Sequence, residues 1–86
     1  MKKRLTKSLY TEEWEALLKI LRDLRLKRGW TQEQLAEKLG RPQSFVAKIE
    51  AGERKLDVCQ FIDYTQVLQA DPVEAMRRLM KAIGRS

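Results

Sequence analysis

One stretch of the chain, from Thr31 to Gly52, constrains the fold more than any other part. It reads TQEQLAEKLGRPQSFVAKIEAG and has room for two short helices with a tight turn between them. Thr31 is a favourable helix N-cap, and Gln34 stands where the partner residue of a capping box is found. Gly40 suits the left-handed conformation that ends a helix, and Pro42 suits the first turn of the next one. The stretch therefore predicts a helix-turn-helix motif over residues 31–52.

The apolar residues of the two helices leave one polar surface free. They fall at helical spacing and are Leu35, Ala36, Leu39, Val46 and Ile49. On the other side of the second helix lie Gln43, Ser44 and Lys48, with no acidic residue among them. A Gln amide offers a donor and an acceptor together, as a base edge in the DNA major groove requires. We therefore expect these three side chains to contact DNA bases or nearby phosphates.

This stretch resembles the helix-turn-helix of the phage-repressor and Cro-like family, also called the XRE family. The TQ opening, the LA pair, the helix-ending Gly, the IE pair and the following Gly with a basic residue all occur in order. The resemblance covers Arg25 to about Leu68. The chain departs from the family at Pro42, because the family usually has Ser or Thr there as the cap of the second helix. The resemblance implies an all-α, five-helix, lambda-repressor-like DNA-binding domain.

The resemblance also implies roles for residues around the second helix. In this family the Arg at the place of Arg25 pairs with the Glu of the IE pair, here Glu50. The chemistry agrees, because a partly buried Arg needs a bidentate acceptor and a carboxylate supplies one. Arg54 and Lys55 lie in the loop where family members contact the phosphate backbone. We expect Gln32 to bind phosphate too, through its amide and the N-terminus of the first helix.

Three further helices are predicted around the motif. The first follows the N-cap Thr11 and has the apolar residues Trp14, Leu17, Leu18, Leu21 and Leu24 at core spacing. The second follows Asp57, with a core face that we expect to contain Val58, Phe61, Ile62, Thr65 and Leu68. The third begins at Asp71 and Pro72 and runs to about Ile83. The strand signals of alternating apolar and polar residues are absent.

These helices define one DNA-binding domain over residues 11–84, preceded by a basic tail over residues 1–10. The tail has no acid and contains Lys2, Lys3, Arg4 and Lys7, so it supplies most of the formal net charge of +6. Three interpretations of the tail stay open. It is a solvated end, an arm that contacts DNA phosphates or the minor groove, or a segment that packs on the domain.

The last predicted helix is more apolar than one buried face requires. Ala75 and Leu79 extend a stripe formed by Val73, Met76, Met80 and Ile83. Either the whole set packs inside the domain, or part of it meets a second subunit. Because one domain of this size reads about half of a typical operator, we expect a homodimer at least on DNA. We place its contact around Met76, Met80 and Ile83.

Two single residues have alternative interpretations. Cys59 is the only cysteine, so no disulfide can form within the chain, which suits a cytoplasmic protein. We expect Cys59 to be a small core residue, with a redox sensor as the alternative. Phe45 either contacts a thymine methyl or sugar, or fills the rim of the core. No apolar run is long enough to span a bilayer and no secretory signal is present, so we expect no membrane partner.

The pattern favours a sequence-specific binder of double-stranded DNA that regulates transcription, as a repressor. Two alternatives keep the DNA binding: the antitoxin of a toxin–antitoxin pair, with a toxin as protein partner, and the controller of a restriction–modification system. A third alternative is a protein-interaction module without DNA binding, which the polar surface of the second helix disfavours. The chain has no histidine, so neither a His-based catalytic triad nor a His-containing metal site can form. We therefore predict no catalytic residues, no metal and no cofactor.

Overall fold

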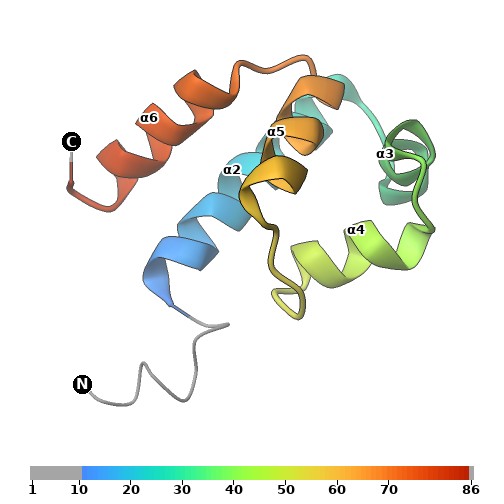
Figure 1. The fold of residues 1–86 in the computed structure, drawn as a ribbon, viewed down its shortest axis with the longest axis horizontal. Helices are drawn as coiled ribbons and strands as arrows, with labels where there is room; N and C mark the ends of the chain where they lie inside the picture. Colours follow the sequence, from blue (N-terminus) through green and yellow to red (C-terminus); the bar gives the residue numbers. More distant parts are fainter. Residues whose placement is uncertain (1–10, 86) are drawn as a thin grey trace.

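The computed structural model describes residues 11–85, and within that range the chain forms five helices and no strand. The helices are α2 (Glu12–Arg28), α3 (Gln32–Leu39), α4 (Gln43–Glu50), α5 (Val58–Val67) and α6 (Pro72–Ala82) (Figure 1). The predicted all-α fold with five helices is confirmed. The basic tail predicted over residues 1–10 lies outside the described residues.

Side-chain caps begin four of these helices. Thr11, Thr31 and Asp57 each accept a hydrogen bond from the backbone N–H three residues further on, and Asp71 accepts one from the N–H two residues on. At Thr31 the Gln34 side chain completes the predicted capping box. These bonds satisfy donors that the start of a helix otherwise leaves free. The helix starts are therefore set by local sequence.

The start of α4 differs from the sequence prediction. Pro42 was expected in the first helical turn, but it is the N-cap residue, with an extended backbone (φ −63°, ψ 154°) and no side-chain cap. Its carbonyl oxygen already accepts from the Phe45 N–H at 2.9 Å, so the helix begins with Gln43. At the other end, Gly52 has a positive φ of 81°, and the Glu53 N–H donates to the Lys48 carbonyl. This turn closes α4 as predicted.

The core lies where α3 packs on α4 and α5, while α2 and α6 close the other side (Figure 1). The most deeply buried side chains, none more than 1% exposed, include Leu21, Leu35, Val46, Ile49, Tyr64 and Leu68. Trp14 and Leu17 are also buried, and Leu18 and Leu24 are partly buried against this core. The apolar spacing of the first predicted helix therefore identified its packed face.

The predicted core face of α5 is partly wrong. Phe61, Thr65 and Leu68 are buried, but Val58 is 74% exposed, Ile62 is 38% exposed and Cys59 is exposed. Successive residues of a helix are rotated by about 100°. Because α5 turns Phe61 and Leu68 inward, Cys59 falls on the opposite side, and Val58 and Ile62 fall at the edge that faces α6.

Candidate nucleic-acid interface

Helix α4 presents a polar surface on a firmly packed back. Gln43, Ser44 and Lys48 are exposed on it. Val46 and Ile49 of the same helix are 0% exposed. The helix therefore has one side fixed in the core and another side free, with no acidic residue in its first turn. Such a helix can offer hydrogen bonds to a ligand without moving its own backbone.

Arg25 and Glu50, which were expected to pair, lie in direct contact. Arg25 Nε donates to Glu50 Oε2 at 2.6 Å, and Arg25 Nη2 donates to Glu50 Oε1 at 2.9 Å. A third donor, Arg25 Nη1, reaches the Trp30 carbonyl oxygen at 2.6 Å. The two side chains are only 9% and 7% exposed. The pair therefore ties α2 and the turn after it to the end of α4, away from bulk water.

A row of hydrogen bonds extends from this ion pair to the surface. Gln32 Nε2 donates to Glu50 Oε1 at 3.0 Å, and Gln43 Nε2 donates to Gln32 Oε1 at 3.1 Å. Gln32 and Gln43 were predicted to have separate roles, and their contact was not predicted. Their one shared sequence signal is that each is the first residue of its helix. The bonds fix the orientation of the Gln43 amide at the N-terminus of α4.

Phe45 belongs to the core rim, the second of the two interpretations from the sequence. Its side chain is buried at 9% exposure. Two guanidinium groups lie over its ring, with Arg41 Cζ at 4.6 Å and Arg54 Cζ at 4.9 Å from the ring centroid. Lys55 is exposed in the same loop as Arg54. Arg41, in the turn before α4, was not among the predicted site residues.

Tyr64 lies buried near the Arg25–Glu50 pair. Burial raises the pKa of the Tyr64 hydroxyl above its ordinary value, the negative charge of Glu50 raises it further, and Arg25 partly offsets these effects. Within residues 11–85 this hydroxyl has no hydrogen-bond partner. Tyr64 is therefore held neutral beneath the interface.

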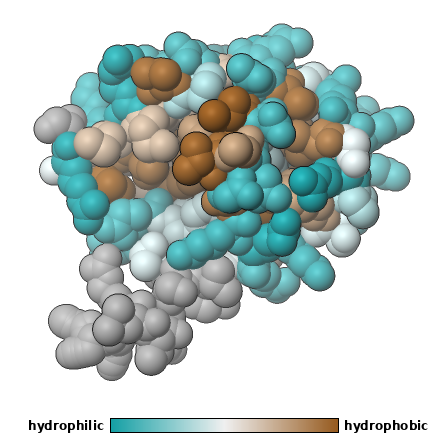
Figure 2. Space-filling view, in the orientation of Figure 1, coloured by the Kyte–Doolittle hydropathy of each residue, from teal (hydrophilic) through white to brown (hydrophobic). Residues whose placement is uncertain are grey.

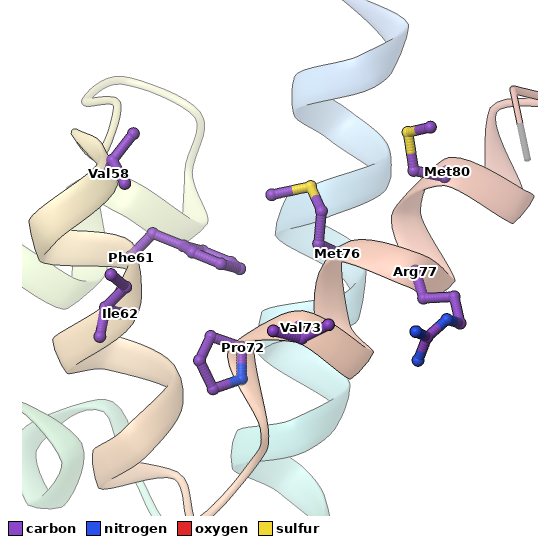
Figure 3. A pocket seen from close by; sticks show the side chains of 8 residues that line it. All are labelled: Val58, Phe61, Ile62, Pro72, Val73, Met76, Arg77 and Met80. Atoms are coloured by element: carbon purple, nitrogen blue, oxygen red, sulfur yellow. The ribbon is translucent and has the colours of Figure 1, made fainter.

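A separate apolar groove of about 730 Å³ lies between α5 and α6. Apolar side chains gather on the face formed by these two helices (Figure 2). The groove is lined by Val58, Phe61, Ile62, Pro72, Val73, Met76, Arg77 and Met80. Figure 3 shows Phe61 and Met76 pointing toward one another from the two helices. Met76 and Met80 are 42% and 38% exposed, whereas Ile83, the C-cap residue of α6, is not part of the lining.

Residues 11–85 contain no group of three or more His, Cys, Asp or Glu side chains that could hold a metal ion. None of the helices within the same range is both long and apolar enough to cross a membrane.

Residues 21–74 match the helix-turn-helix family of sequences. An XRE-family-like protein from Pseudomonas syringae pv. tomato str. DC3000 is 40% identical to the chain. The match covers 92% of this chain and 96% of that protein, with a TM-score of 0.81. The chain belongs to the XRE family of helix-turn-helix proteins. The family and the fold thus support a DNA-binding transcription regulator.

Two further solved structures resemble this XRE-family protein. A point mutant of the restriction–modification controller protein C.Esp1396I is 25% identical, and the match covers 87% of this chain and 95% of that one with a TM-score of 0.77. The clp gene regulator ClgR from Corynebacterium glutamicum is 20% identical, with coverage of 86% and 79% and a TM-score of 0.75, and supports the fold alone. No curated protein matches the chain.

Proposed function

We propose that this XRE-family protein is a sequence-specific repressor that binds double-stranded DNA as a homodimer, with α4 in the major groove. The observation that supports this is the exposed, acid-free row of Gln43, Ser44 and Lys48 on a helix whose other side is buried. A bound dimer covers its operator and excludes other proteins from that DNA, which is the physical basis for repression.

The hydrogen-bonded Gln43 amide is suited to reading adenine. A Gln amide has two N–H donors and one acceptor oxygen. One donor of Gln43 goes to Gln32, which leaves the second N–H for adenine N7 and the oxygen for adenine N6. Gln32 in turn holds the amide in place. Ser44 and Lys48 extend the reading surface along α4.

The charged residues of the following loop serve as anchors. Arg54 and Lys55 are exposed beyond the end of α4. Cations in such a position bind phosphate oxygens and fix the register of the protein on DNA without reading sequence. Gln32 retains a second N–H for phosphate beside the N-terminus of α3, where the helix dipole also favours an anion.

The groove between α5 and α6 supplies the dimer contact. Its exposed apolar side chains include Val58, Val73 and Met76, at 74%, 61% and 42% exposure. Apolar surface of this kind is stabilised when a second subunit removes it from water. Two-fold pairing of the α5–α6 face would present two copies of α4 to half-sites about one DNA turn apart, roughly 34 Å.

Substitutions at Gln43 and Arg54 test the division between reading and anchoring. Gln43→Ala is expected to cost roughly 1–3 kcal/mol on the preferred duplex and little on random duplexes. Arg54→Ala is expected to weaken binding to every duplex and to make the slope of log K against log salt shallower by about one. Binding titrations over a range of salt measure both effects, and Gln66→Ala, an exposed Gln on α5, is the matched control.

If Gln43→Ala lowers the affinity for preferred and random duplexes equally and also reduces the salt slope, Gln43 is a phosphate anchor and not a base-reading residue. No change in either variant would remove α4 and its following loop from the DNA interface altogether.

The likeness to C.Esp1396I favours control of a restriction–modification system as a second candidate function. The DNA-binding surface would be the same, and only the regulated genes would differ. A methyltransferase reading frame beside the gene for this protein, with the operator in their shared upstream region, supports this candidate. A neighbouring toxin reading frame would support an antitoxin instead.

A further inference from the structure

Two arginines from the segments at opposite ends of α4 each lie against the same aromatic ring, that of Phe45. Arg41 lies in the turn before the helix and Arg54 in the loop after it, and both guanidinium groups lie close to the centroid of the Phe45 ring, at 4.6 and 4.9 Å. The ring is only 9% exposed and belongs to the core. Phe45 is therefore a fixed platform that brings two otherwise flexible cations to one flank of α4.

Both cations are available to an external anion. Arg41 and Arg54 are exposed, and no carboxylate of residues 11–85 forms an ion pair with either. Stacking on an aromatic face restricts a guanidinium while its N–H edge stays free to donate. Such a group binds phosphate with two parallel hydrogen bonds and loses less side-chain entropy than an unrestrained Lys or Arg.

The flank that holds these arginines borders the reading surface. Phe45 and Lys48 are three residues apart on α4 and so are neighbours on the helix surface. When a helix lies in the major groove, its flanks face the sugar–phosphate walls of that groove. Arg41 and Arg54 are then beside one wall, while Gln43 lies on the opposite side of α4, toward Gln32.

We propose that Arg41 and Arg54, stacked on Phe45, form a clamp that binds the phosphate backbone of one DNA strand. This adds Arg41 to the DNA-contacting residues and makes Phe45 a positioning residue. The inference rests on the proposed function, because it requires α4 to lie in the major groove. The clamp supplies affinity for any sequence and leaves discrimination to the reading surface.

The test is a salt-dependent binding titration on preferred and random duplexes. Arg41→Ala is expected to weaken binding to both by about three- to tenfold near 0.1 M salt and to reduce the salt slope by about one. Arg41→Ala with Arg54→Ala is expected to reduce the slope by about two. Arg78→Ala removes the same charge from an exposed position of α6 and is expected to leave the slope unchanged.

Two variants test the platform with the charges retained. Arg41→Lys keeps the cation but loses the planar fork, and Phe45→Leu keeps an apolar rim but removes the aromatic face. Both are expected to weaken binding to all duplexes by a few-fold while the salt slope stays as in the unchanged protein. Urea unfolding of Phe45→Leu measures the fraction of this variant that is folded. The DNA affinities of the variant and the wild-type protein are then compared per folded molecule.

The clamp is overturned if Arg41→Ala binds DNA with wild-type affinity and a wild-type salt slope while Arg54→Ala shows a reduced salt slope. The proposed function would still stand in that case. If the unchanged protein binds no duplex, the proposed function and the clamp both fail.

Discussion

At the residue scale, the Arg25 side chain connects parts of the chain that lie far apart in sequence. It donates to Glu50 on α4 and to the Trp30 carbonyl after α2. Removing one member of a buried pair leaves the other charge without compensation. We expect Arg25→Ala or Glu50→Ala to lower the free energy of unfolding by about 3–5 kcal/mol, as measured by urea denaturation.

A double variant distinguishes pairing from simple loss of packing. Arg25→Met with Glu50→Leu removes both charges and keeps apolar volume, so it is expected to be much more stable than either alanine variant. If each single alanine variant costs less than about 1 kcal/mol, water reaches the site and the pair behaves like a surface ion pair.

Tyr64 gives a pH-dependent prediction at the same scale. Its pKa is raised in the folded protein, so above about pH 10 the unfolded chain loses this proton while the folded chain keeps it. The free energy of unfolding then falls as pH rises, by up to about 1.4 kcal/mol per pH unit from this residue.

Tyr64→Phe isolates that contribution. The variant is expected to be at least as stable as the unchanged protein at pH 7, because the hydroxyl has no partner within residues 11–85. Its stability is also expected to fall less steeply above pH 10 in thermal unfolding over a pH series. Equal slopes for the two proteins would mean that Tyr64 ionises as easily folded as unfolded.

Some contacts at this scale were predictable and others were not. The Arg25–Glu50 pair followed from the family resemblance together with the chemistry of a partly buried Arg. The Gln32–Gln43 contact and the stacking of Arg41 on Phe45 depend on the rotamers of exposed side chains and on how α3 meets α4. Sequence spacing does not encode those variables.

At the scale of elements, the starts of α2, α3, α5 and α6 were predictable because their capping signals are local, whereas the start of α4, at Pro42, was not. Thr31 with Gln34 and Asp71 with Pro72 determine their helix starts within a few residues. The rotation of α5 was not predictable in the same way, since its sequence offers apolar residues on more than one side. Its neighbours decide which side is buried, and they leave Val58 and Ile62 beside α6.

The groove between α5 and α6 gives a prediction for assembly. Met76 is 42% exposed, so Met76→Glu is expected to leave the fold intact but to place a charge in the proposed dimer contact. Sedimentation with and without a duplex carrying two half-sites is expected to show fewer dimers for this variant. Leu26→Glu is the matched control, because Leu26 is 52% exposed on α2 and does not line the groove.

If Met76→Glu forms as many dimers as the wild-type protein, the dimer contact lies elsewhere on the molecule. One monomer of the unchanged protein per duplex would contradict a dimer altogether.

At the scale of the whole molecule, the two proposed tasks of DNA binding and dimerisation fall on different surfaces of the described domain. Helix α4 and its flanking loops present Gln43, Lys48 and the two stacked arginines, while α5 and α6 present the apolar groove. The ion pair between Arg25 and Glu50 supports the first surface from inside the fold. We therefore expect DNA recognition and dimerisation to be separable by substitution.

The most direct test is enrichment of random duplexes on the purified protein, followed by sequencing. If α4 reads the major groove in a two-fold dimer, the enriched sequences will share a palindromic consensus with half-sites about one helical turn apart, roughly 34 Å. Gln43→Ala is expected to relax this consensus at one position of each half-site. Enrichment of no common sequence, or of a single half-site without its symmetric mate, would contradict sequence-specific recognition by a dimer.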